Sequence, residues 1–77
     1  MIKAIIHYND INDDFIRIDD ILGILKYKYK NIDISYKKIK KKKLFITING
    51  EKLDCNYSLD YYMQAVDNIL NKDGIYD

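Results

Sequence analysis

The dipeptide Asn49-Gly50 narrows the possible folds of this chain more than any other feature. It separates the β-branched and aromatic run 44–48 from segment 51–55, and an Asn-Gly pair in that position is the strongest short-range signal of a β-hairpin. Segment 32–37 precedes this pair of segments and alternates apolar and polar side chains with the period of a half-buried strand. We therefore predict an antiparallel three-strand meander over residues 32–55.

The two ends of the chain predict one more strand and a helix. Residues 2–8 form a short β-rich segment, and the Asn/Asp cluster that follows it ends the strand. Towards the C-terminus, Ser58 is a favourable N-cap and Gly74 a favourable stop. The apolar residues between them recur at helical spacing. They are Leu59, Tyr62, Met63, Val66, Ile69 and Leu70. We predict an amphipathic helix whose apolar face covers the sheet.

The apolar residues of segment 14–30 fit both the spacing of a helix and the alternation of a strand. Several of its apolar residues recur at helical spacing, while parts of it also alternate like strands. The residues at helical spacing are Phe15, Ile18, Leu22, Leu25 and Tyr29. Our interpretation divides the segment into a short strand at 14–18, paired with the first strand, and a helix over about 20–29 that begins at Asp19 or Asp20.

The length of 77 residues suits one domain, which would bury only about 60% of the surface that its unfolded chain exposes. With 48% apolar and 32% charged residues, the sequence lies within the range of folded globular proteins. We therefore expect residues 1–77 to form one α+β domain. Its small, mostly antiparallel sheet consists of the 32–55 meander and the N-terminal strand, and the C-terminal helix covers it, with a second short helix around 20–29.

The sequence also bears on location. No segment is long and apolar enough to cross a membrane, and the start of the chain lacks the features of a signal peptide. The single cysteine, Cys55, cannot form an internal disulfide, which fits a reducing compartment. We expect a cytoplasmic protein without a membrane partner.

Residues that carry catalysis or bind metals are scarce and scattered. His7 and Cys55 are the only histidine and cysteine, and they stand on separate predicted strands. Zinc sites need several such ligands at set spacing, and the three glycines are too far apart for a phosphate-binding loop. We predict that the chain is not an enzyme, has no cofactor or metal site, and acts by binding.

The most visible binding surface is basic and aromatic. Although the net charge is only +1, residues 26–43 carry nine basic side chains and one acidic one. Lysines can neutralise phosphates, and tyrosine rings can stack on unpaired bases. The candidate residues are Lys37, Lys38, Lys40, Lys41, Lys42, Lys43, Tyr27, Tyr29 and Tyr36. A lysine-rich edge strand also keeps sheets from aggregating, and that structural explanation stays open.

A second candidate surface is the outer face of the predicted C-terminal helix. Its residues are Asp60, Tyr61, Gln64 and Asp67. Together with the acid-rich segment 10–20, these residues could attract a basic, nucleic-acid-handling protein, and aromatic residues are enriched in interface cores. The alternative explanation is a solvated helix face that has no partner.

These surfaces leave two functions open. The chain contains 15 Ile, 12 Lys, 8 Tyr and 7 Asn, the residue types that AT-rich coding sequences favour. In this composition, its small size and its lack of catalytic residues, it resembles accessory proteins of phages and mobile elements, which commonly block a host enzyme. This resemblance implies a non-enzymatic inhibitor or modulator of the anti-defence, anti-CRISPR-like type that docks on a larger nucleic-acid-handling protein. The alternative is a small nucleic-acid-binding module that uses residues 26–43. A homodimer through an exposed sheet edge is compatible with both functions.

Overall fold

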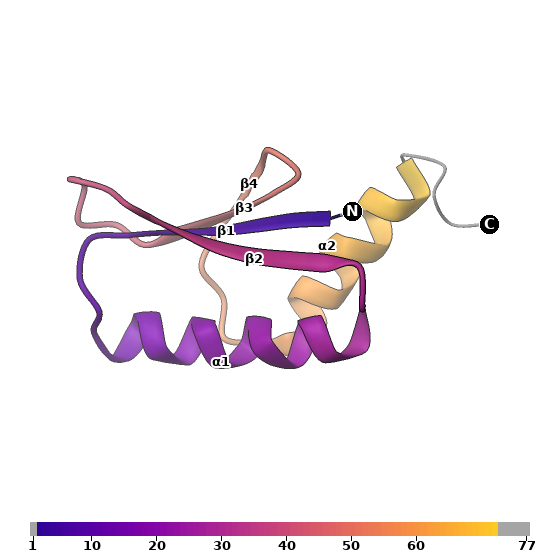
Figure 1. Ribbon diagram of the computed structural model, residues 1–77, viewed down its shortest axis with the longest axis horizontal. Coiled ribbons are helices and arrows are strands. Elements are labelled where there is room, and N and C mark those ends of the chain that lie inside the picture. Colours follow the sequence, from indigo (N-terminus) through magenta and orange to yellow (C-terminus); the bar gives the residue numbers. More distant parts are fainter. Residues whose placement is uncertain (1, 73–77) are drawn as a thin grey trace.

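The computed structural model describes residues 2–72, which form one sheet and two helices (Figure 1). In chain order the elements are β1 Ile2–Tyr8, α1 Asp13–Lys28, β2 Ile32–Lys38, β3 Phe45–Ile48, β4 Glu51–Leu53 and α2 Leu59–Lys72. Helix α1 lies along one face of the sheet (Figure 1), and α2 contributes to the same apolar core beside it. The predicted α+β architecture, a small sheet with the C-terminal helix packed against it, is confirmed, and the sheet is mixed because one of its three strand pairings is parallel.

The strand order is β2-β1-β3-β4, which corrects the predicted meander in one pairing. β1 pairs antiparallel with β3, and β3 with β4, but β1 also pairs in parallel with β2 and so separates β2 from β3. The helix α1 is the crossover connection that a parallel pair requires. The central position of β1 suits its sequence, because Ile2, Ala4 and Ile6 are at most 2% exposed.

Helix α1 replaces the strand that we predicted at 14–18, and that prediction is wrong. The helix begins after Asn12, whose side chain accepts a hydrogen bond from the backbone N–H of Phe15 at 3.0 Å. Two acidic residues in the first turn favour this end of the helix dipole. Asp19 and Asp20 therefore lie inside the helix and do not cap it. The helical period therefore describes the segment correctly, because the residues that it places on one face are buried. They are Phe15, Ile18, Leu22 and Leu25.

The predicted hairpin forms at Asn49-Gly50. Both residues have positive φ angles, 50° and 86°, as a two-residue hairpin turn requires. The turn is also tied to the neighbouring strand, because the backbone N–H of Lys3 donates to the Asn49 side chain at 2.8 Å and the Asn49 N–H donates to the Lys3 carbonyl at 2.9 Å. The hairpin thereby holds β3 in register with β1.

Helix α2 buries the central part of the face that its sequence predicts. Tyr62, Val66 and Ile69 are at most 4% exposed and join the core formed by β1, β3 and α1. The Tyr62 hydroxyl accepts a hydrogen bond from the backbone N–H of Asn56 at 2.9 Å, so the loop before α2 is anchored to the core. The predicted stop at Gly74 lies outside the described residues.

Candidate functional site

The face of the sheet opposite the helices is uncovered in the described part of the chain. Successive strand residues point to opposite faces, and those on the helix side include the fully buried Ala4, Ile6, Ile46 and Ile48. None of the residues on the other side is buried. They are Lys3, Ile5, His7, Asp33, Ser35, Lys37, Phe45, Thr47 and Lys52. We call this surface the open face.

A stacked pair of rings occupies one end of the open face. His7 and Phe45 are register partners on β1 and β3, and their ring centroids lie 4.3 Å apart with an angle of 7° between the planes. The Lys52 ammonium lies 4.6 Å from the Phe45 centroid, and Lys37 is the register partner of His7 on β2. A row of lysine, histidine, phenylalanine and lysine therefore crosses the sheet from β2 to β4.

The surroundings of His7 hold its imidazole in the neutral form. Partial burial, followed by the positive charges of Lys37 and Lys52, lowers the pKa of His7 below its ordinary value of 6.5. The ring nitrogen Nε2 lies 3.0 Å from the Thr47 hydroxyl, which orients the imidazole against Phe45. An anion placed between the two lysines would offset their field. The site is thus electrostatically prepared for negative charge.

Loop 39–44 extends this row into a basic cavity. The cavity is lined by His7, Lys37, Ile39, Lys40, Lys41, Lys43, Phe45 and Lys52, and none of these residues is acidic. Two kinds of contact hold the loop against the end of β1. The backbone N–H of Ile39 donates to the Tyr8 carbonyl at 2.7 Å, and the Asn9 side-chain amide donates to the carbonyls of Ile39 at 3.0 Å and Lys40 at 3.3 Å. The lysines therefore project from a backbone that is fixed at its start.

The structure brings four of the six predicted lysines together. Lys37, Lys40, Lys41 and Lys43 line the basic cavity. Lys38 follows Lys37 on β2 and so points to the helix side of the sheet. The remaining one, Lys42, lines a separate hollow with residues of the loop before α1.

The predicted tyrosines do not join the lysines of the basic cavity. Tyr27 and Tyr29 precede β2 and lie near the end of α1, whereas loop 39–44 follows β2, so the two groups lie at opposite ends of the molecule (Figure 1). The Tyr29 hydroxyl donates to the Asp67 carboxylate at 2.9 Å. The Tyr36 hydroxyl donates to Asp19 at 2.6 Å on the helix side of β2. The basic and aromatic character of segment 26–43 is therefore divided between separate surfaces.

The predicted acidic surface on α2 is smaller than its sequence indicated. Asp60 and Gln64 are exposed. Tyr61 is half-buried and packs edge-on against Tyr62, with 5.0 Å between the ring centroids. Asp67 is half-buried and accepts the hydrogen bond from Tyr29. Tyr29 and Asp67, which we assigned to two different surfaces, thus form one contact between the end of α1 and α2.

Three residues of the row that crosses the sheet were not predicted as binding residues: His7, Phe45 and Lys52. They lie on three different strands, so only the pairing of β1 with β3 and of β3 with β4 brings them together. The available signal was the alternation along each strand, which places each of them on the polar side. Using that signal requires the strand order, which the sequence did not reveal.

His7 and Cys55, the only histidine and cysteine, lie in different surroundings. His7 contacts Thr47 and Phe45, while partial burial and the nearby Asp14 carboxylate raise the pKa of the Cys55 thiol. A thiol with a raised pKa is a poor nucleophile at neutral pH. Among residues 2–72 no group of three or more potential metal ligands occurs. No helix in that range has the length and apolar character needed to cross a membrane.

No family model, curated protein or solved structure matches the chain. The chemistry of the open face is therefore the basis for its functional assignment.

Proposed function

We propose that this chain binds single-stranded nucleic acid in the basic cavity of its open face. The observation that carries the proposal is the row of Lys37, His7, Phe45 and Lys52, in which two stacked rings lie between two ammonium groups on an uncovered sheet. Lysines neutralise phosphates and release their counterions, and aromatic side chains stack on unpaired bases. The two kinds of group that single-strand binding requires thus lie side by side.

The dimensions of the row suit a short stretch of a flexible strand. From β2 to β4 it crosses three strand spacings of about 4.8 Å each, or about 14 Å, which is the length of a few nucleotides. The Lys52 side chain is long and exposed, and its ammonium covers one face of the Phe45 ring. When that ammonium turns to a phosphate, the ring face becomes available to a base.

The composition of the site favours binding that tolerates different sequences. Proteins that recognise guanine specifically in a duplex commonly do so through two hydrogen bonds from an arginine guanidinium. The chain has one arginine, Arg17, and its guanidinium lies 5.2 Å from the centroid of the Tyr57 ring, outside the basic cavity. Phosphate contacts and stacking are the interactions that remain, and neither depends strongly on base identity.

Fluorescence anisotropy with labelled oligonucleotides tests the proposal. Single-stranded DNA and single-stranded RNA are compared with a duplex of equal length, at low and at physiological salt. We expect the protein to prefer the single strands, and the comparison of DNA with RNA shows which polymer fits better. The triple variant Lys37→Gln/Lys41→Gln/Lys52→Gln should lose most of this binding, because its substitutions remove three phosphate contacts.

A matched control carries the same loss of charge at the end of helix α1. The variant Lys26→Gln/Lys28→Gln/Lys30→Gln also lowers the net charge from +1 to −2, but none of its three positions lines the basic cavity. It should bind like the wild type, provided that circular dichroism shows both variants to be folded. Equal losses in the two variants would mean that only net charge matters and would refute the site.

The protein-docking modulator that the sequence suggested is the competing outcome of this experiment. If neither single strand binds at low salt, the nucleic-acid proposal is wrong. The chain would then remain a candidate inhibitor of a larger nucleic-acid-handling protein, such as a phage accessory protein acting in the host cytoplasm.

A further inference from the structure

Strand β2 forms an edge of the sheet whose outward backbone groups have no strand partner among residues 2–72. Two hydrogen bonds at the ends of the β1–β2 ladder define which residues face β1: the N–H of Ile2 donates to the Asn31 carbonyl, and the N–H of Ile39 donates to the Tyr8 carbonyl. In a parallel ladder the residues that bond the neighbouring strand alternate with those that do not. The odd-numbered residues of β2 therefore bond β1, and Ile34 and Tyr36 direct their N–H and C=O groups outward.

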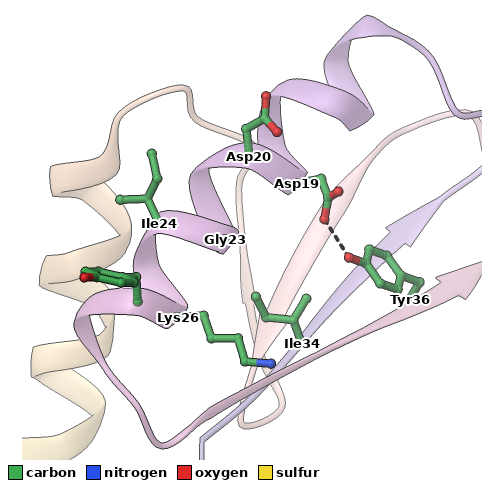
Figure 2. A pocket seen from close by; sticks show the side chains of 8 residues that line it. Asp19, Asp20, Gly23, Ile24, Lys26, Ile34 and Tyr36 are labelled. Carbon is green, nitrogen blue, oxygen red and sulfur yellow. Dashed lines mark hydrogen bonds between the residues drawn. The ribbon is translucent and has the colours of Figure 1, made fainter.

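A groove runs beside this edge, between β2 and α1. Figure 2 shows Asp19 and Lys26 of the helix on the side of Ile34 and Tyr36 of the strand, so charged as well as apolar side chains line the groove. The Ile24 side chain is 49% exposed, that of Tyr36 51%, and that of Tyr27, which lines the same groove, 86%. Both the backbone edge and the apolar side chains next to it are thus available for one partner.

We propose that a second copy of this chain covers the edge, with the two β2 strands paired antiparallel about a twofold axis at Ser35. This arrangement places Ile34 of each copy opposite Tyr36 of the other, and both residues have outward-facing backbone groups that form a hydrogen-bonded pair. It also places Asp33 opposite Lys37 twice. A twofold interface needs a surface that complements itself. The charges of β2 and its outward-facing backbone groups both meet this condition.

The charges select this register over its neighbours. Moving the axis by one residue, to Ile34 or Tyr36, places Asp33 and Lys37 opposite uncharged residues. Moving it by two residues, to Asp33 or Lys37, brings identical charges face to face, which destabilises an antiparallel pair. Within strand β2, only the axis at Ser35 gives two attractive pairs, and they lie at non-hydrogen-bonded positions, where opposite side chains are closest.

The same arrangement accounts for the exposed apolar side chains of β2. Ile34 and Tyr36 lie on the helix side of β2, so pairing the edges joins the groove of one copy to that of the other. Asp19 and Lys26 of α1 line the same groove, so charged side chains flank the apolar ones at the junction. The dimer would have one continuous sheet with an open face on one side and the helices on the other, and the open edge at β2, a known aggregation risk, would be closed.

Analytical ultracentrifugation over a range of protein concentrations tests the proposal with charge-reversal variants. The wild type should form dimers. Asp33→Lys alone and Lys37→Asp alone each turn both attractive pairs into repulsive ones, and each should weaken self-association by about tenfold or more. Mixing the two variants in equal amounts should restore dimers, because Lys at position 33 of one chain then faces Asp at position 37 of the other.

The control is Lys52→Asp, which makes the same charge change on the opposite edge of the sheet. It should dimerise like the wild type. The proposal is wrong if the wild type stays monomeric up to millimolar concentration, or if the mixture of variants fails to recover the dimer while each variant retains a wild-type circular dichroism spectrum. A loss of dimer in the Lys52 variant equal to that in the Lys37 variant also overturns it.

Discussion

Exchange of Lys37, Lys41 and Lys52 for glutamine has a quantitative consequence for the salt dependence of nucleic-acid binding. Five lysines line the basic cavity: Lys37, Lys40, Lys41, Lys43 and Lys52. Each phosphate contact on a single strand contributes about −0.7 to the slope of log K against log salt concentration, so we expect a slope of about −3.5 for the wild type and about −1.4 for the triple variant.

These slopes correspond to clearly separable affinities. Between about 50 and 200 mM salt, the wild type should lose about 100-fold in affinity and the triple variant only about 7-fold. The assay is anisotropy of one labelled single strand at a series of salt concentrations. At low salt the variant binds more weakly than the wild type, and the two curves approach each other as the salt concentration rises.

The control variant at Lys26, Lys28 and Lys30 decides whether the slope reports on the site. It has the same net charge as the triple variant but keeps all five lysines of the cavity. Its slope should remain about −3.5. The reasoning is refuted if the control loses as much slope as the cavity variant, or if the cavity variant keeps the wild-type slope, since the phosphates would then contact other residues.

Two further predictions concern pKa shifts. By NMR titration, the pKa of His7 should lie below 6.5, and inorganic polyphosphate should raise it by offsetting the neighbouring lysines. Because the folded-state pKa is lowered, the stability contributed by neutral His7 is present above about pH 6.5 and is lost as the pH falls through the folded-state pKa; His7→Gln should lack this component. Tyr62→Phe should lower the free energy of unfolding by about 1–3 kcal/mol in urea titrations, because the Asn56 N–H loses its acceptor. Burial raises the pKa of Tyr62 from 10.0 to about 12, so the folded state disfavours the ionised phenol, and the wild type but not the variant should lose stability as the pH rises from 10 to 12.

The elements that could be predicted are those encoded by local signals. The Asn49-Gly50 turn requires two positive φ angles that few other residue pairs adopt. Helix α2 has an apolar stripe of a single period, so its buried face could be identified from spacing alone. In both cases the local preference and the tertiary packing agree.

The start of α1 was misjudged because two periods overlap there. Ile16 fits an alternating pattern with Ile18, yet it is 50% exposed while Ile18 is fully buried. The helix begins earlier because the Asn12 side chain caps it and because Phe15 continues the apolar stripe of Ile18. A surface isoleucine in a chain rich in isoleucine carried no information about burial.

The strand order lay beyond the reach of local signals, and the site depends on it. An antiparallel meander and a parallel crossover use the same β2 sequence, and they differ only in which strand lies beside it. Once α1 is a full helix, a parallel β1–β2 pair follows readily, because such a pair needs a helical crossover. That pair places Lys37 beside His7, and the antiparallel β1–β3 pair places Phe45 on its other side.

Lys37 belongs to both proposed surfaces, and this shared residue couples them. In the dimer its ammonium faces Asp33 of the second copy, whereas in the basic cavity it would face a phosphate. A lysine that is paired with a carboxylate neutralises a phosphate less well, so nucleic acid should bind the monomer more tightly than the dimer. Linkage makes the effect reciprocal: saturating oligonucleotide should shift the monomer–dimer equilibrium of the wild type towards monomer, as measured by ultracentrifugation. If oligonucleotide instead drives dimer formation, Lys37 is not shared between the two surfaces, and the strand must cross the junction between the two sheets.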